Sequence, residues 1–428
     1  MSRPVLRVGL LGCGHVGGAL ARLLIEDAGR IAARTGLDLR LAAVAVRHPE
    51  RRREPALPAE LLTTDPGAVV TDPTVDLVVE VMGGLDPARG LIVRALKAGK
   101  PVVTANKELL AARGAELFEV AGAAGVDLLF EAAVGGGIPL IRPLRESLAG
   151  EDVRRITGIV NGTTNFVLTR MTEDGTSYEE AMAEARRRGY AEADPTADVE
   201  GWDAAAKAAI LASVAFGAPI RGADVHREGI TALGAVDIAA ARRLGFVIKL
   251  LAVVEAAGGG VAVRVHPAMV PADHPLASVR DSFNAVFVEG PAVGELMFLG
   301  RGAGGSPTAS AVLGDLLDAA HNLRAGGPGR TVQLHDVPLR PIDELVSACY
   351  LSLEVADRPG VLHAVTGVLG RHQVSIRSME QDPEPGEAGA RLLFVTHPAA
   401  ERDLQACLRD LSELDVVRRV GNLIRVVG

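Results

Sequence analysis

Short apolar runs alternate with amphipathic stretches over the first 130 residues of the chain. The apolar run at 5–11 is followed by a helical pattern at 16–27, and a second helix is predicted at 87–98. The predicted strands of this region lie at 5–11, 39–46, 76–81, 100–104 and 128–130. Strands that alternate with helices in this way are typical of βαβ units. The pattern therefore predicts an α/β fold with a parallel sheet.

The turn between the first strand and the first helix has the sequence Gly12-Cys-Gly-His-Val-Gly17, a G-x-G-x-x-G motif in its required context. Gly12 permits a tight turn, Gly14 permits close approach of a pyrophosphate, and Gly17 permits close packing of the helix on the strand. The N-terminus of the helix favours an anion at this point. We predict a Rossmann-type dinucleotide-binding domain and assign His15 and Val16 to its cofactor-binding turn. A glycine-rich structural turn is the alternative.

Arginines follow the second predicted strand, where NAD-specific sites usually carry an acidic residue. Arg47 comes directly after the strand, and Arg51, Arg52 and Arg53 are close to it. An acidic residue would bind the ribose 2′-hydroxyl of NAD, whereas an arginine can bind the 2′-phosphate of NADP. This pattern favours NADP, with NAD still possible. The alternative is a solvated basic turn.

Polar residues also follow the later strands of the predicted sheet. Ligands of parallel sheets bind at the carboxyl ends of the strands, where Thr104 and Lys107 lie. Thr104 is assigned to the cofactor, and Lys107 to the cofactor or the substrate; a surface lysine at a helix start is the alternative. Further along, Glu131 precedes three glycines at 135–137, and its carboxylate and free carbonyl oxygens could bind a hard cation. A flexible crossover between domains is the alternative there.

The segment 185–207 is rich in acidic and turn-forming residues. Its acidic members in the loop are Glu192, Asp194, Asp198, Glu200 and Asp203. An alanine-rich helix is predicted to follow at 204–216, with Lys207 as its only charge. Asp203 and Lys207 are four residues apart and share a helix face. If the helix is interior, burial disfavours the ammonium and suits Lys207 to proton transfer. The alternative is an ordinary surface ion pair.

A second sheet is predicted after residue 131. A strand at 153–160 runs into Asn161-Gly-Thr-Thr-Asn165, which we predict as a loop whose donors are open to a carboxylate. Thr163 lies at the centre of this loop. Further strands are predicted at 261–270, 284–288 and 295–299. Residues 131–300 are therefore predicted as an α+β domain with an open sheet that binds the substrate.

The pattern changes again after residue 300. Gly302 and Gly304 lie in a glycine-rich loop that enters a predicted helix at 308–318, and 326–347 has the composition of a linker. Later strands are predicted at 350–355, 374–379, 391–396 and 416–427, and helices at 361–371 and 399–411. This β-α-β-β-α-β order predicts a C-terminal ferredoxin-like domain at 348–428.

Composition and charge narrow the class of protein. The 428 residues carry a net charge of −8, from 45 basic and 53 acidic residues, which argues against binding to nucleic acids or anionic membranes. Three cysteines without disulfide or zinc spacing favour a reducing compartment. No apolar run approaches the length of a membrane span, and the N-terminus lacks a cleavable apolar segment. We expect a soluble, cytoplasmic protein.

Several motifs together resemble homoserine dehydrogenase in its form with a C-terminal ACT domain. The segment 185–207 is similar to the family's pattern position by position. Further similar motifs lie at 103–107, 159–165 and 300–308. The sequence Asp-Arg-Pro-Gly-Val-Leu at 357–362 resembles an ACT domain, a module that pairs with another copy to bind amino acids. A plain dimerisation module is the alternative for that part.

The resemblance covers essentially the whole chain and implies three domains. A Rossmann domain is expected at 1–130 and is completed by 301–325. A substrate-binding, catalytic and dimerisation domain is expected at 131–300, and an ACT regulatory domain at 348–428. The implied activity is the reversible NAD(P)H-dependent reduction of L-aspartate 4-semialdehyde to L-homoserine, in the biosynthesis of threonine, methionine and isoleucine.

The resemblance also implies roles for individual residues. Lys207 is expected to donate the proton and Lys107 to add a second positive charge near the reacting oxygen. Glu192 and Asp203 are expected to bind the substrate ammonium, Asp198 to order the loop or a lysine, and Thr163 with its loop to hold the α-carboxylate. The implied cofactor residues further along the chain are Gly189, Gly302 and Gly304. The implied ligands of a structural sodium ion are Glu131 and the backbone oxygens of Val134, Gly136 and Ile138.

The resemblance leaves some properties open and some rivals in place. L-threonine is the expected effector and a dimer or tetramer the expected assembly, while the cofactor preference and the occupancy of the cation site stay open. One rival is a non-catalytic NAD(P)-sensing protein; both lysines and the acidic set argue against it, because a sensor needs no proton donor. Another is a Rossmann dehydrogenase for a different amino-acid carbonyl. An assay of nicotinamide absorbance with homoserine and either NADP or NAD distinguishes a homoserine dehydrogenase from these two rivals.

Overall fold

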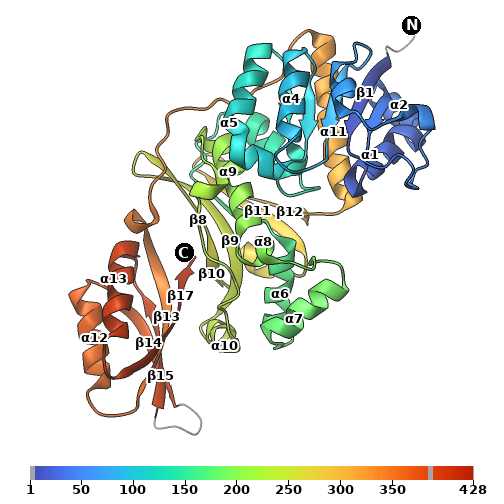
Figure 1. Cartoon of the computed structure of the whole chain (residues 1–428). Helices are drawn as coiled ribbons and strands as arrows, with labels where there is room; N and C mark the ends of the chain where they lie inside the picture. Colours follow the sequence, from blue (N-terminus) through green and yellow to red (C-terminus); the bar gives the residue numbers. More distant parts are fainter. Residues whose placement is uncertain (1–4, 384–388, 428) are drawn as a thin grey trace. The chain divides into compact units, whose positions relative to one another are not determined.

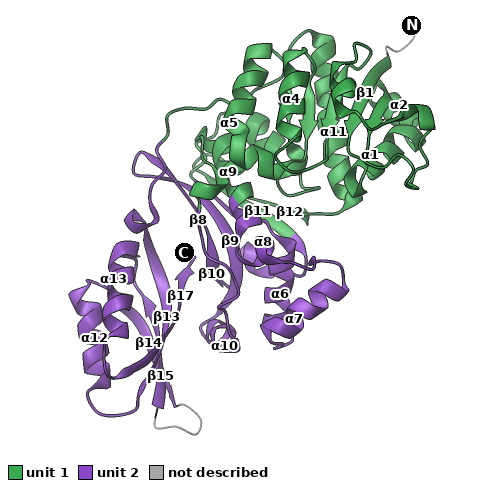
Figure 2. Cartoon of the chain, in the orientation of Figure 1, with its two compact units in different colours: residues 1–154, 206–225, 284–337 green, residues 155–205, 226–283, 338–428 purple. Residues whose placement is uncertain are grey.

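The structure of the chain is a computed structural model that describes residues 5–383 and 389–427. It divides into two compact units, shown in different colours in Figure 2. The first unit comprises residues 1–154, 206–225 and 284–337. The second comprises residues 155–205, 226–283 and 338–428. Each unit is therefore assembled from segments that are distant in the sequence.

A parallel sheet forms the centre of the first unit (Figure 1). Its strands are β1 (Val5–Leu11), β2 (Asp38–Ala45), β3 (Leu62–Thr63), β4 (Leu77–Glu80), β5 (Val102–Thr104) and β6 (Leu128–Leu129). They lie in the order β3-β2-β1-β4-β5-β6, and every neighbouring pair is parallel. This order is that of the doubly wound dinucleotide-binding fold, so the predicted fold class is confirmed.

Helices pack on this sheet and complete its core. They are α1 (His15–Glu26), α2 (Ala28–Thr35), α3 (Pro66–Thr71), α4 (Ala88–Lys97), α5 (Lys107–Ala124) and α11 (Gly305–Ala325). Although α11 comes much later in the sequence, its Val312 and Leu316 share a buried cluster with Leu10 and Leu20. The sequence pattern predicted only the middle of α11, and it did not predict α2 or α3.

The first unit contains further short elements beside the parallel sheet. They include η1 (Ala59–Leu61), η2 (Glu131–Ala133), η3 (Pro143–Ser147), η4 (Gly222–Asp224), most of β11 (Phe283–Gly290) and β12 (Gly294–Arg301). Helix α9 (Trp202–Phe216) begins among residues of the second unit and continues into the first. The turn η4 lies against both α9 and α5. A Cβ atom on Gly222 would be 3.3 Å from Ala111 Cβ and 3.3 Å from Ala206 Cα.

A mixed sheet forms the centre of the second unit. In spatial order its strands are β7 (Arg155–Ile159), β9 (Phe246–Ala257), β10 (Gly260–Pro271), β17 (Val417–Val426), β13 (Val346–Ala356), β15 (Gly389–Thr396) and β14 (Ile376–Pro383). The short strands β8 (His226–Arg227) and β16 (Ala399–Ala400) pair with β10 and β13. The helices are α6 (Gly162–Glu173), α7 (Tyr178–Arg187), α8 (Thr196–Val199), α10 (Ala235–Arg243), α12 (Val361–Arg371) and α13 (Glu401–Ser412), with short turns η5 (Pro275–Ser278) and η6 (Ile342–Glu344).

The C-terminal part of this unit has the predicted ferredoxin-like order. Its elements run β13-α12-β14-β15-α13-β17, and the helices close a core of their own around Leu353, Val365 and Leu404. The sequence did not predict that this ferredoxin-like part and the part containing β7, β9 and β10 are joined through one sheet. Strand β17 pairs with β10 in parallel, with Ala268 opposite Arg425. The two parts therefore share one continuous hydrogen-bonded sheet.

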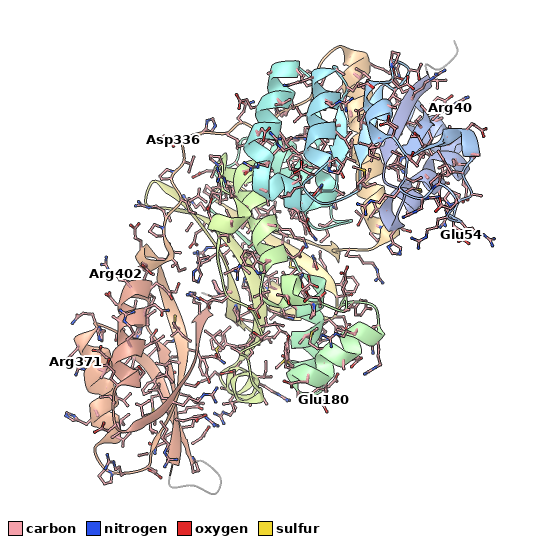
Figure 3. The ribbon with its side chains drawn as sticks, in the orientation of Figure 1. Arg40, Glu54, Glu180, Asp336, Arg371 and Arg402 are labelled. Atoms are coloured by element: carbon pink, nitrogen blue, oxygen red, sulfur yellow. The ribbon has the colours of Figure 1, made fainter. Side chains whose placement is uncertain are left out.

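Charged side chains cover much of the surface of the chain. Arg40, Glu180 and Arg371 are exposed examples, and they extend away from the ribbon in Figure 3. Among the described residues, no helix combines the length and the apolar character needed to cross a membrane.

Candidate active site

The glycine motif forms the turn from β1 into α1. Gly12 has a φ of +96°, and a Cβ atom there would lie 2.9 Å from the carbonyl oxygen of Val81. A Cβ atom on Gly17 would lie 2.2 Å from the carbonyl oxygen of Gly12. At Gly14, in contrast, a Cβ atom would meet no protein atom within 4 Å. The protein's own packing requires the first and third glycines, whereas the open space at Gly14 is available to a ligand.

A cavity of about 940 Å³ opens beside this turn in the first unit. It is lined by the glycine turn, by the loop after β4, and by Gly305 and Ser306 at the start of α11. A Cβ atom on Gly305 would lie 2.9 Å from the carbonyl oxygen of His15, so the first turns of α1 and α11 are adjacent. Two helix N-termini therefore contribute to the lining, and each favours a bound anion.

Arginine side chains give this cavity a strong positive charge. Those in the lining are Arg22, Arg47, Arg51, Arg52 and Arg53. The acidic residue Glu54 also contributes to the lining, beside these guanidinium groups. Guanidinium groups bind phosphate oxygens in a fixed, often bidentate geometry. The residues present therefore fit a dinucleotide with more than one phosphate group.

The structure places the predicted cofactor residues in different positions around the cavity. Gly12, Gly14, His15 and Arg47 line it, whereas Val16 and Gly17 lie in the first turn of α1. Gly304 precedes α11 with a φ of +120°. Sequence reasoning missed Arg22, Gly305 and Ser306 as lining residues. Glycines at 304–305 were a usable signal, but nothing local marks Arg22.

Thr104, assigned above to the cofactor, does not line this cavity. It is buried in β5, and its hydroxyl group donates to Glu80 Oε2 at 2.7 Å. Glu80 Oε1 in turn accepts the N–H groups of Met82 at 2.8 Å and Gly83 at 3.1 Å. Thr104 therefore supports the loop that lines the cavity and leaves its hydroxyl group no free proton for the cofactor.

The two predicted catalytic lysines belong to the first unit. Lys207 lies in α9 and is 7% exposed, so of the two alternatives left by the sequence the interior helix is the one observed. Lys107 is half-buried at the first position of α5, whose N-terminus is capped by the Asn106 side chain. Since η4 packs against both helices beside Ala111 and Ala206, the two lysines come from elements of one packed group.

A hydrogen-bonded acidic cluster occupies the second unit. The side-chain amide of Asn161 donates to Asp198 Oδ1 at 2.7 Å and to Asp203 Oδ2 at 2.9 Å. The hydroxyl group of Thr163 lies 2.9 Å from Asp198 Oδ2 and 2.7 Å from the carbonyl oxygen of Tyr190. Asp203 is 8% exposed and lies one helical turn before Lys207 on α9. These contacts hold two carboxylates in fixed positions.

The predicted loop at 161–165 is wrong, because α6 already begins at Gly162. The side chain of Asn161 accepts the N–H group of Thr164 at 2.9 Å and so caps the helix. The predicted donors therefore belong to a helical first turn. The hydroxyl group of Thr163 is engaged with Asp198 and Tyr190 and is not open to a carboxylate.

Two predicted residues lie outside this cluster. Glu192 is exposed in the segment between α7 and α8. Gly189 ends the turn after α7 with a φ of +74°, a conformation that favours glycine. Its N–H group donates to the carbonyl oxygen of Arg186 at 3.0 Å. The positive φ of this turn thus explains why a glycine occurs at this position, with no need for a bound ligand.

The carboxylate of Glu131 is held by backbone N–H groups. Its oxygens accept the N–H groups of Leu140, Ile141 and Arg142, and the N–H group of Glu131 donates to Asp315 at 2.7 Å. Burial raises the pKa of Asp315 to about 7, helped by the charge of Glu131. No group of three or more His, Cys, Asp or Glu that could hold a metal ion occurs among the described residues.

A parallel Rossmann-type sheet, a positively charged cavity large enough for a dinucleotide and a buried lysine define the chain as an NAD(P)-dependent oxidoreductase. Family comparisons agree with this class. The homoserine dehydrogenase NAD-binding domain matches residues 12–131, the homoserine dehydrogenase family model matches 139–317, and the ACT domain matches 350–416.

Individual relatives identify the family. The chain is 48% identical to homoserine dehydrogenase of Mycobacterium tuberculosis, over 98% of this chain and 97% of that protein. The crystal structure of a homoserine dehydrogenase from Thiobacillus denitrificans superposes with a TM-score of 0.93 at 41% identity, over 99% and 98% of the two chains. A hyperthermophilic archaeal homoserine dehydrogenase in complex with NADPH has a TM-score of 0.63 at 29% identity, over 74% and 98%. The chain therefore belongs to the homoserine dehydrogenase family and carries a C-terminal ACT domain.

Proposed function

We propose that Lys207 is the proton donor in the reaction of this family, the reversible reduction of L-aspartate 4-semialdehyde to L-homoserine. A bound nicotinamide supplies the hydride that attacks the aldehyde carbon. The ammonium group of Lys207 donates a proton to the oxygen as it becomes a hydroxyl group, and the amine accepts it in the reverse direction. Lys107 adds a second positive charge beside that oxygen. The burial of Lys207, 7% exposed on a helix without other charges after Asp203, is the observation that carries this proposal.

The acidic cluster supplies the site for the substrate ammonium. Asp203 binds this group directly, together with Glu192 from the exposed segment, while Asp198 fixes the position of Asn161 and Thr163. Support comes from the buried Asn161 amide, which holds both Asp198 and Asp203. Prearranged carboxylates lose less orientational freedom on binding than mobile ones. The first turn of α6, which contains Thr163, is proposed to hold the substrate's α-carboxylate through the positive end of its helix dipole, because the Thr163 hydroxyl group itself is engaged with Asp198 and Tyr190.

NADP is the proposed cofactor, with NAD as a possible second one. Arg47 and the arginines at 51–53 line the cavity beyond the glycine turn, where a 2′-phosphate would add negative charge. The NADPH complex of the archaeal relative supports the same cofactor. Gly302 and Gly304 shape the segment that enters α11, and Gly189 is proposed to contribute its backbone.

A sodium ion is proposed to bind to Glu131 and to the backbone oxygens of Val134, Gly136 and Ile138. Outside the helices and strands, no backbone N–H group of the described residues donates to the carbonyl oxygens of Val134, Gly136 or Ile138. Gly136 has a φ of +58°, and a Cβ atom there would lie 2.4 Å from the carbonyl oxygen of Gly302. The loop is thus tightly packed while three of its carbonyl oxygens keep their lone pairs, which fits a hard cation with a structural role.

L-threonine is the proposed effector, acting through the ACT domain. Arg425 in β17 is 3% exposed, and its guanidinium group contacts Glu401 at 2.6 Å and Glu228 at 2.8 Å. Burial opposes ionisation of Glu228, but the hydrogen bond from His226 and the charge of Arg425 lower its pKa to about 2. An ion pair therefore joins the last strand of the ACT domain to the loop after β8.

The same loop continues to the acidic segment. The N–H group of Ile230 donates to the carbonyl oxygen of Val199 at 2.8 Å, and the hydroxyl group of Thr231 donates to Glu200 at 2.9 Å. Both acceptors directly follow Asp198 in the sequence. If β17 shifts when an amino acid binds, the displacement can therefore be transmitted through Glu228 to Asp198 and Asp203, the carboxylates of the proposed substrate site.

We further propose that the protein works as a homo-oligomer in the cytoplasm. Cys13, Cys349 and Cys407 are free, which fits a reducing compartment. The size of the oligomer, a dimer or a tetramer, follows from light scattering of the purified protein.

Replacement of Lys207 by alanine tests the proposed reaction. Lys207→Ala should bind NADP normally and lose about a hundredfold or more in turnover of homoserine, because it lacks the proton donor. Lys100→Ala is the matched control, since Lys100 is also buried in the first unit but donates to the backbone oxygen of Asp72. Near-normal turnover in Lys207→Ala, measured by nicotinamide absorbance, would remove this lysine from the mechanism.

A change at Arg47 tests the cofactor preference. Arg47→Ala should raise the KM for NADPH by about tenfold and change the KM for NADH much less, since only NADPH carries the 2′-phosphate. Arg40→Ala serves as control, because Arg40 pairs with Asp38 on β2 outside the cavity. Equal changes for both cofactors would refute the 2′-phosphate role.

Millimolar L-threonine should inhibit the protein and raise its melting temperature. Glu228→Gln should still bind L-threonine, seen as the same thermal shift, but should need at least about fivefold more for half inhibition, because a neutral amide no longer attracts Arg425. Glu354→Gln, whose partners Arg391 and Arg419 lie within the ACT domain, is the control. Unchanged activity and melting with L-threonine would exclude the effector. Normal inhibition of Glu228→Gln would exclude this path.

A further inference from the structure

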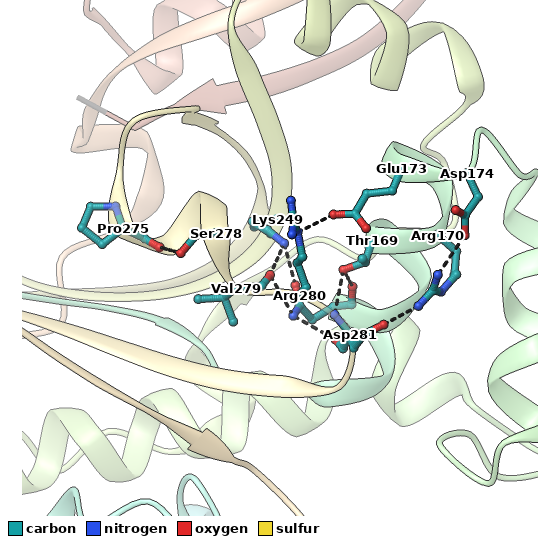
Figure 4. A network of polar contacts seen from close by, with 11 residues as sticks. Thr169, Arg170, Glu173, Asp174, Lys249, Pro275, Ser278, Val279, Arg280 and Asp281 are labelled. Atoms are coloured by element: carbon teal, nitrogen blue, oxygen red, sulfur yellow. Dashed lines mark hydrogen bonds and ion pairs between the residues drawn. The ribbon is translucent and has the colours of Figure 1, made fainter.

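A lysine that the proposed reaction does not use is buried in the second unit (Figure 4). Lys249 in β9 is 2% exposed. Its amine donates to Asn165 Oδ1 at 3.0 Å and to the carbonyl oxygen of Val279 at 2.5 Å. Both partners are uncharged. An ammonium group without a carboxylate partner is costly to bury, so its presence calls for a physical reason beyond packing.

Charged groups surround Lys249 but pair with one another (Figure 4). Arg280 contacts Glu173 at 2.5 Å, while Arg170 contacts Asp281 and lies 2.9 Å from Asp174. Burial lowers the pKa of Lys249 to about 8, although the carboxylates of Glu173 and Asp281 oppose this shift and Arg280 adds to it. A neutral amine still has two N–H groups, which is enough for both acceptors. Lys249 therefore supplies directed hydrogen bonds in either protonation state.

The first acceptor, Asn165, ties α6 to the segment 279–283. With its oxygen bound to Lys249, the two N–H protons of its NH₂ group are shared among the carbonyl oxygens of Val279 at 3.3 Å, Asp281 at 2.9 Å and Phe283 at 3.1 Å. A side-chain amide can rotate by half a turn, and both the carbonyls at its nitrogen and the donor at its oxygen oppose that rotation. Lys249 therefore reinforces the orientation of Asn165 by supplying the donor at the amide oxygen.

The segment 279–283 closes tightly over the first turn of α6. Asp281 has a φ of +52°, an uncommon conformation for a residue with a side chain. Its N–H group donates to the hydroxyl group of Thr169 at 3.2 Å. A Cβ atom on Gly162 would lie 2.8 Å from the carbonyl oxygen of Ser282. The first turn thus has little room to shift while Asn165 keeps its orientation.

That first turn carries the residues that organise the acidic cluster. Asn161 caps α6 and donates to Asp198 and Asp203, and Thr163 contacts Asp198. A rotation of the first turn would move both side chains together. The contacts run from Lys249 through Asn165 to the carboxylates that are proposed to bind the substrate.

We propose that Lys249 is a positioning residue: by orienting Asn165 it holds the first turn of α6, and with it the Asn161 side chain, in the arrangement that places Asp203 for the substrate ammonium. This role rests on the proposed function of the acidic cluster. Lys249 itself touches neither substrate nor cofactor.

Replacement of Lys249 by methionine tests this role in the full-length protein. Lys249→Met keeps the length of the side chain but removes both donors, so the KM for homoserine should rise about tenfold while the KM for NADP stays unchanged. Asn165→Ala should give the same rise, and the double variant should give no further rise, because the lysine acts through the amide. If Lys249→Met does not fold, Lys249→Gln, which keeps an N–H donor, should fold and show a smaller rise.

Lys100→Met is the matched control for loss of a buried lysine. Its amine also donates to a backbone oxygen, but it lies in the first unit, so the KM for homoserine should stay unchanged. An unchanged KM for homoserine in Lys249→Met, or equal rises for homoserine and NADP, would overturn the positioning role. So would additive effects in the double variant. A failure of the acidic cluster as the ammonium site would appear separately, as an unchanged KM for homoserine in Asp203→Asn.

The pH dependence of stability tests whether the amine is buried in solution. The folded pKa of Lys249 is about 8, below the value near 10.4 in an unfolded chain, so the unfolded chain binds more protons between these values. The contribution of Lys249 to the free energy of unfolding of the wild-type protein should therefore increase as the pH rises from 8 toward 10. The melting temperature of wild type relative to Lys249→Met should rise by about 4 °C between pH 7.5 and 9.5. A constant difference would mean a solvated amine and would contradict the proposal.

Discussion

The side-chain amide of Asn161 is the interaction on which the proposed substrate site depends. Its oxygen accepts the N–H group of Thr164 and so starts α6, while its NH₂ group holds Asp198 and Asp203. Two carboxylates this close would repel each other and move apart if they lacked such donors. Because one amide serves both, the helix start and the acidic cluster form together. A substrate ammonium group therefore finds its negative charges already arranged.

Each unit carries charges opposite to those of the ligand group it is proposed to bind. The first unit surrounds its cavity with guanidinium groups and two helix N-termini, which suits the phosphates of a dinucleotide. The second unit presents carboxylates, which suit an ammonium group. Lys207 and Asp203 lie one turn apart on α9, so the helix itself sets the spacing of the proton donor and the ammonium-binding group along the chain.

The ACT domain is joined to the substrate part more closely than its linker composition indicates. Strand β17 extends the sheet of β10, and the buried Arg425 reaches Glu228 across this junction. An arginine buried at a sheet junction resists small displacements, because any shift leaves a charge without its partner. A displacement within the ACT domain is therefore passed to the substrate part through a rigid junction. A flexible linker between the two would absorb such a displacement.

The sequence by itself determined the alternation of strands and helices in the first domain, the glycine turn, a helix around Lys207 and the ferredoxin-like domain. These features depend on local periodicity and on glycine conformations, which neighbouring residues encode. The tertiary structure alone decided that Asn161 holds Asp198 and Asp203, that Thr104 supports a loop, and that Lys249 meets Asn165, 84 residues away. The pairing of β17 with β10 was likewise decided only by the tertiary structure. Such pairings depend on which distant segments meet after folding, and backbone hydrogen bonds between strands leave no local signal of their partner.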